Sequence, residues 1–326
     1  MTQRSIKAES IKRVVVRGAN WVGDAVMTVP ALRELRRVLP GAHVTLATRP
    51  WAEGVFAGAD FIDDLLHVEA GGLASHLRQV RAWRAGRFDL ALLFPNAFQP
   101  AFVAWAARVP LRLGYATDGR GALLTHASAP PAWRKSRHEV FYYLNLVGEL
   151  ERLLTGASTV ETREPRLALS VSTERDEAAR ASLRRSGVDV ARPLVALCPG
   201  STNSRAKRWP AASFAALADR LVEEAGAEVV ILGAREELDV TREVSALMRR
   251  RAVVLTGRTT LDETTALLGL VDLLVTNDTG PAHVAAALGR PVLVIFGPTD
   301  PVTTRPFSPL AEVVRRPPDC APCMLR

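Results

Sequence analysis

Short apolar runs alternate with longer amphipathic segments along nearly the whole chain. The apolar runs are typical of buried strands, and the segments between them have the spacing of helices. We predict strands at residues 14–16, 43–47, 88–94, 111–115, 194–197, 228–232, 253–255, 272–275 and 291–297, and helices at 24–39, 101–108, 138–153, 210–225, 236–250, 261–270 and from 280 onward. This alternation predicts parallel sheets covered by helices on both faces.

The pattern starts afresh after residues 155–164, which have the glycine, serine and charged side chains of a linker. We therefore expect an α/β protein of two Rossmann-like, doubly wound parallel-sheet domains, residues 1–165 and 166–326, that face a central cleft. Pro30 is expected to kink the helix at 24–39. The second domain is expected to continue beyond Arg326.

Composition narrows the class of protein. Hydrophobic residues make up 48% of the chain and charged residues 23%, as in soluble globular proteins. The longest apolar region, residues 90–109, is interrupted by prolines and amides, so no transmembrane helix is expected. The first residues lack the apolar core of a signal peptide, which favours a cytoplasmic location. Cys198, Cys320 and Cys323 form no disulfide framework and no second pair follows the last two, so no metal site is expected.

The net charge of +8 arises almost entirely from arginine, since only four of the 42 basic residues are lysines. Arginines spread along the whole chain fit solvated helix faces. They also fit attraction to an anionic partner, either a phosphorylated substrate or an acidic membrane face. The sequence has no basic stripe or aromatic platform, so a nucleic-acid partner is not expected.

The most informative polar cluster is the NDTGPAH sequence at residues 277–283, between two predicted strands. Open α/β sheets bind ligands at such junctions, where a helix starts at the carboxyl end of a strand. Gly280 allows a bound group to come close to the backbone, and Thr279 and the first helical amides can hold an anion. Asp278 and His283 are expected to face the same crevice.

A second polar loop, residues 198–210, offers hydroxyl groups, amides and one ammonium group, all suited to a diphosphate. Lys207 is a compact charge that can follow a leaving phosphate, although a solvated loop is the simpler interpretation. Glu237 follows another strand, at a position from which a carboxylate accepts hydrogen bonds from ribose hydroxyls. The next junction contains Thr259, and Thr260 and Glu263 have the spacing of a capping box.

The first junction of the chain reads ANWVGD at residues 19–24. Gly18 and Gly23 do not have the spacing of a dinucleotide-binding loop, which argues against a nicotinamide enzyme. Asp24 lies at a helix start, where backbone amides and the helix dipole keep a carboxylate ionised. It is either a helix cap or a catalytic base.

Together, the WVGD, AKRW and NDTGPAH motifs at residues 21–24, 206–209 and 277–283 resemble the heptosyltransferases of lipopolysaccharide inner-core assembly, glycosyltransferase family 9. The resemblance covers both domains. ANWVGD, PGSTNSRAKRW and DCAPC are most similar to the branch that adds the second heptose. The resemblance implies a GT-B fold and an inverting, metal-independent transfer of heptose from ADP-heptose onto Kdo-lipid A that already bears one heptose. No cofactor is implied.

The resemblance also assigns roles to residues. It implies that Asp24 takes the proton from the acceptor hydroxyl and that Lys207 neutralises the departing diphosphate. Donor contacts are implied for Thr202, Asn203, Lys207, Glu237, Thr259, Asp278, Thr279, Gly280 and His283.

The acceptor is expected on the first domain. The densest basic cluster lies just before a helix and could meet acceptor phosphates or carboxylates, with surface solvation as the alternative. The candidate acceptor residues are Asn20, Trp21, Arg134, Lys135 and Arg137, with His138 beside them. An acceptor on a lipid raises the prospect of peripheral association with the inner leaflet of the inner membrane. Other interpretations remain open: a GT-B enzyme or epimerase with a different nucleotide sugar, or a non-catalytic sugar-nucleotide-binding protein.

Overall fold

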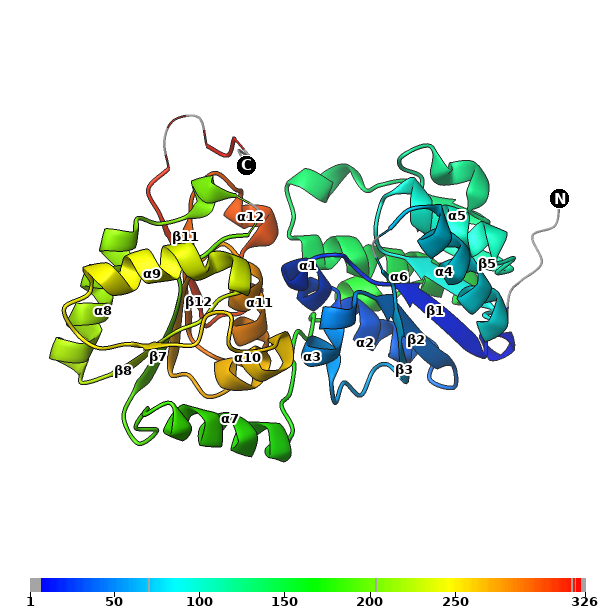
Figure 1. The fold of residues 1–326 in the computed structure, drawn as a ribbon. Coiled ribbons are helices and arrows are strands. Elements are labelled where there is room, and N and C mark those ends of the chain that lie inside the picture. The colour runs from blue at the N-terminus through cyan, green and yellow to red at the C-terminus, as the bar shows by residue number, and fades with distance from the viewer. Residues whose placement is uncertain (1–6, 70, 203, 318, 320, 324–326) are drawn as a thin grey trace. The chain divides into compact units, whose positions relative to one another are not determined.

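A computed structural model describes residues 7–69, 71–202, 204–317, 319 and 321–323 (Figure 1). The chain divides into two compact units, which we describe separately. The first comprises Met1–Ala52 and Ala59–Leu167, and the second Glu53–Gly58 and Ala168–Arg326. Asn203 and Cys320, which the sequence analysis singled out, lie outside the described residues.

The first unit is built on a six-stranded parallel sheet in the order β3-β2-β1-β4-β5-β6. The strands are β1 Arg13–Arg17, β2 His43–Thr48, β3 Asp64–His67, β4 Leu90–Leu93, β5 Leu111–Tyr115 and β6 His126–Ser128. The α-helices are α1 Val22–Met27, α2 Val29–Val38, α4 Leu73–Gly86, α5 Phe98–Ala106 and α6 Glu139–Thr155, with 3-10 turns at Ala8–Ser10, Pro50–Ala52, Arg120–Leu123, Ala132–Lys135 and Val160–Thr162.

Apolar residues of the central strands form the core of this unit. Val14–Val16 of β1 are fully buried between β2 and β4, which explains why this strand has no polar alternation. Trp83 of α4 and Ala101 of α5 pack in the same apolar cluster as Val15. The hydrophobic effect on these buried faces holds the helices onto the sheet.

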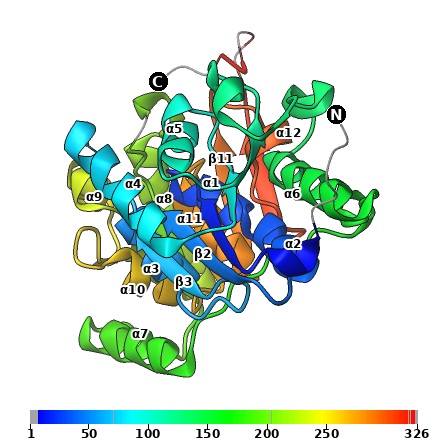
Figure 2. The same cartoon turned by 90° about the vertical axis from the view of Figure 1, so that its right-hand side faces the viewer.

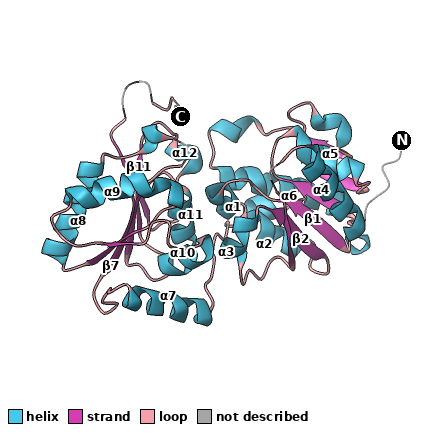
Figure 3. Cartoon of the chain, in the orientation of Figure 1, coloured by secondary structure: helices cyan, strands magenta, loops and turns pink. Residues whose placement is uncertain are grey.

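The second unit repeats the architecture, with a six-stranded parallel sheet in the order β12-β11-β10-β7-β8-β9 (Figure 3). The strands are β7 Leu194–Cys198, β8 Glu228–Ile231, β9 Val253–Val254, β10 Leu273–Asn277, β11 Val292–Phe296 and β12 Ala311–Arg315. The α-helices are α3 Glu53–Phe56, α7 Thr173–Arg185, α8 Ala211–Ala225, α9 Leu238–Leu247, α10 Leu261–Leu268, α11 Gly280–Ala287 and α12 Pro301–Thr304, with 3-10 turns η6 Arg205–Lys207 and η7 Arg235–Glu237. The predicted α/β class with two parallel sheets is confirmed.

The single kinked helix predicted at residues 24–39 is wrong in detail. The segment forms two helices, because α1 ends at Met27 and α2 starts at Val29 with Pro30 in its first turn. Between them, the Thr28 hydroxyl donates to the Ala25 carbonyl at 2.6 Å. A proline inside a helix would remove a backbone hydrogen bond, whereas the first turn tolerates it.

A short segment from the first half of the sequence belongs to the second unit. Gly54 of α3 packs so closely on α10 that a Cβ at this position would lie 2.5 Å from the Asp262 backbone nitrogen. Arg175 of α7 joins both elements: its guanidinium donates to the carbonyls of Gly54 and Asp262, each at 3.0 Å, and pairs with the Asp262 carboxylate at 2.6 Å. The absence of a side chain at Gly54 therefore allows α3 to pack closely against α10.

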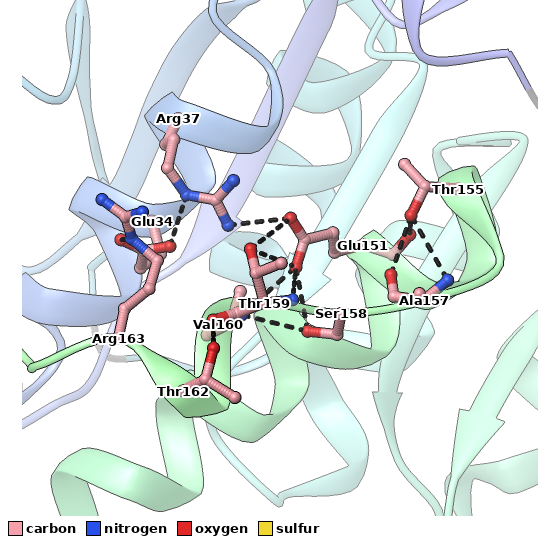
Figure 4. A network of polar contacts seen from close by, with 10 residues as sticks. All are labelled: Glu34, Arg37, Glu151, Thr155, Ala157, Ser158, Thr159, Val160, Thr162 and Arg163. Atoms are coloured by element: carbon pink, nitrogen blue, oxygen red, sulfur yellow. Dashed lines mark hydrogen bonds and ion pairs between the residues drawn. The ribbon is translucent and has the colours of Figure 1, made fainter.

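A buried carboxylate fixes the end of α6 in the first unit (Figure 4). Glu151 accepts hydrogen bonds from the Arg37 guanidinium at 2.8 Å, the Ser158 hydroxyl at 2.9 Å and the Thr159 amide at 2.6 Å. Burial alone would raise the pKa of Glu151, but these donors and the charge of Arg37 lower it to about 2. The folded state thus favours the ionised carboxylate, and this stabilisation is lost as the pH falls through the range between about 4.5 and about 2.

Replacement of Glu151 by glutamine is expected to lower the free energy of unfolding by about 2 to 3 kcal/mol at pH 7, because the ionised partner of Arg37 is lost. The difference from the wild type should shrink as the pH falls from about 4.5 to about 2, because the carboxylate is protonated first in the unfolded state and then in the folded state. Urea denaturation at a series of pH values measures this. Glu149→Gln is the matched control on the same helix: its ion pair with Arg152 is 37% exposed on both sides, and its removal should cost less than about 1 kcal/mol. An equal effect of both substitutions would contradict the assignment.

Candidate functional site

Predicted site residues of the second unit follow adjacent strands at the carboxyl edge of its sheet. Thr202 and Lys207 follow β7, Glu237 follows β8 and Thr259 follows β9. The residues at 278–283 follow β10, the neighbour of β7 on its other side. Parallel strands thus deliver all these side chains to one edge, where doubly wound sheets bind their ligands.

An ion pair joins two of the predicted residues. The Lys207 ammonium lies 2.6 Å from Oδ2 of Asp278 and 3.3 Å from the Asp278 carbonyl oxygen. The same Oδ2 accepts a hydrogen bond from the Thr299 hydroxyl at 2.7 Å. The Asp278 side chain is 7% exposed and that of Lys207 is 21% exposed. An ammonium has three N–H donors, so Lys207 can keep its contacts with Asp278 and still donate to an anion.

Asn277 is the first residue of the NDTGPAH cluster, and the sequence analysis gave it no role; it holds the loop that carries Lys207. Its buried amide donates to the carbonyls of Pro199 at 2.8 Å and Gly200 at 3.2 Å. Its Oδ1 accepts from the backbone amide of Trp209 at 2.9 Å. One side chain at the end of β10 therefore binds both ends of the loop after β7 and sets the position of η6 between them.

Glu237 lies against two glycines at the ends of β7 and β8. A Cβ on Gly200 would come within 2.2 Å of the Glu237 carboxyl carbon, and a Cβ on Gly233 within 2.9 Å of Oε2. Oε2 accepts from the Ala234 amide at 2.8 Å, and Oε1 accepts from the Thr202 hydroxyl at 3.4 Å. The carboxylate is thus held at the sheet edge, beside the loop that contains Thr202.

The start of α11 combines hydroxyl groups with helical amides. Thr279 is the N-cap residue, and its hydroxyl lies 3.1 Å from that of Thr276. Gly280 is the first helical residue, and His283 is buried in the first turns of the helix. The partial positive charge of a helix start favours an anion here.

Thr259 makes its side-chain contact within its own junction and not with the other predicted site residues. Its hydroxyl lies 2.9 Å from that of Thr264 in α10, next to the capping box of Thr260 and Glu263, which is confirmed. This junction therefore stabilises the start of α10, and a donor contact of Thr259 stays a prediction.

In the first unit, Asp24 occupies the first turn of α1 and is partly buried, while Trp21 takes the N-cap position. The charge of Asp24 acts on two side chains of α6, Glu139 and Tyr143. Burial raises the pKa of Tyr143 well above its ordinary value, and the charges of Asp24 and Glu139 raise it further. Burial also raises the pKa of Glu139, with Arg134 lowering it and Asp24 raising it. Asp24, Glu139 and Arg134 therefore contribute to one electrostatic environment around Tyr143, which we call the polar cluster of α1 and α6.

A buried arginine, also missed in the sequence analysis, fixes the loop before Asp24. The Arg17 guanidinium donates to the Gly18 carbonyl and to the Asn20 amide oxygen, the latter at 2.6 Å. Burial and the charge of Arg49 lower the pKa of Arg17 to about 10. Asn20 is thus engaged by Arg17, whereas Trp21 beside it is 58% exposed.

The predicted basic cluster lies on aromatic rings. The Arg134 guanidinium is 4.4 Å from the centre of the Tyr142 ring, and that of Arg137 is 3.7 Å from the centre of the Phe141 ring. Lys135 is exposed, and His138 caps α6 by accepting from the Val140 amide at 3.2 Å. Cation–π contacts hold Arg134 and Arg137 in defined positions at the surface of the first unit.

The described residues also bear on metal sites and membrane spans. Within them, no group of three or more histidine, cysteine, aspartate or glutamate side chains could hold a metal ion. No helix among those the structure describes is long and apolar enough to cross a membrane.

Comparison with known proteins identifies the family. The chain is 28% identical over 313 residues to lipopolysaccharide heptosyltransferase 2 of Escherichia coli K12 and 26% identical over 313 residues to lipooligosaccharide heptosyltransferase 2 of Haemophilus influenzae, covering 93% of this chain and 88% of each relative. The solved E. coli ADP-heptose LPS heptosyltransferase II matches with a TM-score of 0.81 and 27% identity, over 94% of this chain and 91% of that one. A family 9 glycosyltransferase from Veillonella parvula matches with a TM-score of 0.84 and 25% identity, over 94% of this chain and 86% of that one.

The family model of glycosyltransferase family 9 (heptosyltransferase) matches residues 76–326. This match runs from within α4 to the end of the chain and covers well over half of it. The chain therefore belongs to glycosyltransferase family 9, the heptosyltransferases, and is a glycosyltransferase.

Proposed function

We propose that this enzyme transfers L-glycero-D-manno-heptose from ADP-heptose onto the first heptose of the lipopolysaccharide inner core, with inversion at the anomeric carbon and without a metal ion. The names of its relatives support the donor and the core acceptor. The observation that carries the chemistry is the Lys207 ammonium, which Asp278 holds in place beside the start of α11, where its remaining N–H donors and the helical amides suit a diphosphate.

In this mechanism the second unit binds the donor. The Lys207 ammonium and the first amides of α11 meet the diphosphate, and their stabilisation of charge grows as the glycosidic bond breaks. Glu237 accepts hydrogen bonds from the ribose hydroxyls. Thr202, Thr279, Gly280 and His283 line the same sheet edge. The metal-free proposal rests on this fixed cation and these helix amides.

The first unit binds the acceptor and supplies the base. The Asp24 carboxylate takes the proton of the acceptor hydroxyl as that oxygen bonds to the anomeric carbon and ADP departs. An aspartate is a weak base toward an alcohol, so the proton moves together with bond formation at an oxocarbenium-like carbon. In this proposal Arg134 and Arg137 meet phosphate or carboxylate groups of the acceptor.

A donor and acceptor panel tests the proposal. We expect transfer of one heptosyl residue from ADP-heptose to Kdo-lipid A that bears one heptose, detected by mass spectrometry, and far slower transfer from ADP-glucose, GDP-mannose or UDP-N-acetylglucosamine. Turnover should persist in excess EDTA, because the diphosphate charge is met by Lys207. Preference for another sugar nucleotide would refute the donor assignment, and loss of turnover that Mg²⁺ restores would refute the metal-free mechanism.

A further inference from the structure

A group of large apolar side chains is exposed on the first unit, on the outer side of α4 and α5. Leu73 is 72% exposed, Leu77 47%, Phe98 46% and Trp105 48%. Phe102 lies between the two aromatic residues and is partly exposed. We call these five residues the α4–α5 face. Isolated exposed apolar residues are ordinary, but a contiguous group marks an interaction site.

Helix geometry places these residues opposite the core. In α4, the buried residues are Ser75, Gln79, Val80 and Trp83. Leu73, Leu77, Arg81 and Arg84 fall within about 80° of one another on the outward side, at 3.6 residues per turn. In α5, Phe98, Phe102 and Trp105 follow the i, i+4, i+7 spacing of a single stripe.

The helices α4 and α5 are neighbours (Figure 2), and polar contacts join them along their length. Outward stripes on two adjoining helices are expected to share one surface. The Gln99 amide of α5 donates to Oε1 of Gln79 in α4 at 3.0 Å. One turn or more further along, the Arg84 guanidinium of α4 donates to the Ala106 carbonyl at 2.6 Å. The Phe98 and Phe102 rings stack at 6.4 Å between centroids, and the Phe102 and Trp105 rings lie 5.9 Å apart.

The charged residues within the two helices are all basic. The sequence of α4 contains Arg78, Arg81 and Arg84 and no carboxylate, and that of α5 contains no charged residue. Arg78 pairs with Glu69, at 2.7 Å, whereas Arg81 and Arg84 extend the Leu73 and Leu77 stripe. Two exposed carboxylates border the face: Glu69, which Arg78 neutralises, and Asp118, which accepts from the Phe98 backbone amide at 2.8 Å. Apolar and aromatic side chains beside an excess of arginines are the features of a surface that lies in the headgroup region of an anionic bilayer.

The position of the face suits a lipid-linked acceptor. Phe98 starts α5 directly after β4, the strand paired with β1 in parallel, and β1 leads to Asp24. Phe98 and Asp24 therefore both follow the carboxyl edge of the same sheet. A bilayer held against α4 and α5 would bring the headgroup region to the unit that, in the proposed function, accepts the sugar.

We propose that the α4–α5 face binds the surface of an anionic lipid bilayer and holds the enzyme at the membrane that carries its acceptor. This inference rests on the proposed function for the identity of the acceptor, but not for binding itself. A second copy of the chain is the less favoured occupant, because a two-fold contact through this face would bring the α4 arginines of both copies together.

Vesicle sedimentation with the full chain tests the proposal. We expect binding to vesicles of phosphatidylcholine with phosphatidylglycerol, weak binding to phosphatidylcholine alone, and loss of binding at high salt. The double variant Phe98→Ser with Trp105→Ser should bind the anionic vesicles at least about tenfold more weakly than the wild type, because binding follows the apolar area inserted. Leu247→Ser with Val302→Ser is the matched control, since both side chains are exposed on the second unit, 50% and 58%; its binding should equal the wild type.

Activity separates this inference from the proposed function. The Phe98 and Trp105 double variant should transfer heptose to a deacylated, soluble acceptor at the wild-type rate and to a vesicle-embedded acceptor more slowly. Absence of wild-type binding to anionic vesicles at low salt, or unchanged binding of the double variant, would overturn the proposal. So would a wild-type dimer in light scattering that the same substitutions dissociate. Failure of the wild type to transfer heptose would instead refute the proposed function and leave the vesicle result standing.

Discussion

Replacement of Asp24 by asparagine is expected to lower kcat by about 10²- to 10⁴-fold, because the amide keeps the shape of the side chain but cannot accept the acceptor's proton. Donor binding should be unchanged, since the donor contacts proposed here belong to the second unit. Steady-state release of ADP measures kcat and KM, and calorimetric titration with ADP-heptose measures donor affinity. A fall in kcat with an unchanged donor Kd is the result expected for a base.

The control for Asp24 is a carboxylate of the same unit that lies away from the polar cluster of α1 and α6. Asp60 pairs with Arg33 at 3.0 Å and is 77% exposed, so Asp60→Asn should leave kcat within about twofold of the wild type. Thermal unfolding of both variants separates catalysis from folding. If Asp24→Asn turned over at the control rate, Asp24 would be a helix-start carboxylate without catalytic function.

The strands that sequence analysis predicted are those with a continuous apolar run. Val14–Val16 and the runs at 194–197 and 272–275 lie in central strands buried on both faces, so their pattern is unambiguous. Three of the four edge strands, β3, β6 and β12, were not predicted. Their residues are partly buried or exposed, so no apolar run marks them. The helix α7 was missed for a similar reason, since only Ala179 and Leu183 are buried along its length.

The sequence analysis identified candidate ligand-binding residues more readily than the residues that position their loops. Lys207, Asp278 and Glu237 lie at predicted strand ends, where local order suffices to suggest a role. Asn277 was missed because its partners, Pro199 and Gly200, are nearly eighty residues away in the chain. Such contacts are specified by the folded sheet order and by no local pattern.

Thr299 and Arg17 were missed for the same physical reason. Thr299 follows β11, and its role depends on the neighbouring position of Asp278 after β10. Arg17 looks like the last charged residue of a strand, yet it is 3% exposed and bonded to the loop before Asp24. A buried cation of this kind is recognisable only when its surroundings are known.

Replacement of Lys207 by methionine is expected to lower kcat/KM by about 10²- to 10³-fold, because the charge that develops on the departing diphosphate loses its fixed counter-ion. Affinity for the product ADP should fall as well, since the ammonium also meets the bound diphosphate. Lys207→Arg should recover only part of the activity, because a planar guanidinium does not reproduce the compact ammonium between Asp278 and the ligand. ADP-release kinetics and calorimetric titration with ADP measure these effects.

Lys207 also neutralises Asp278, so a loss of activity could arise from an unpaired buried carboxylate. The double variant Lys207→Met with Asp278→Asn separates the two causes, because it removes both charges and leaves a neutral acceptor for the Thr299 hydroxyl. If Lys207 acts on the diphosphate, the double variant should regain thermal stability without regaining activity. If the double variant recovers activity, Lys207 serves only to balance Asp278, and the cation at the diphosphate must then come from another residue.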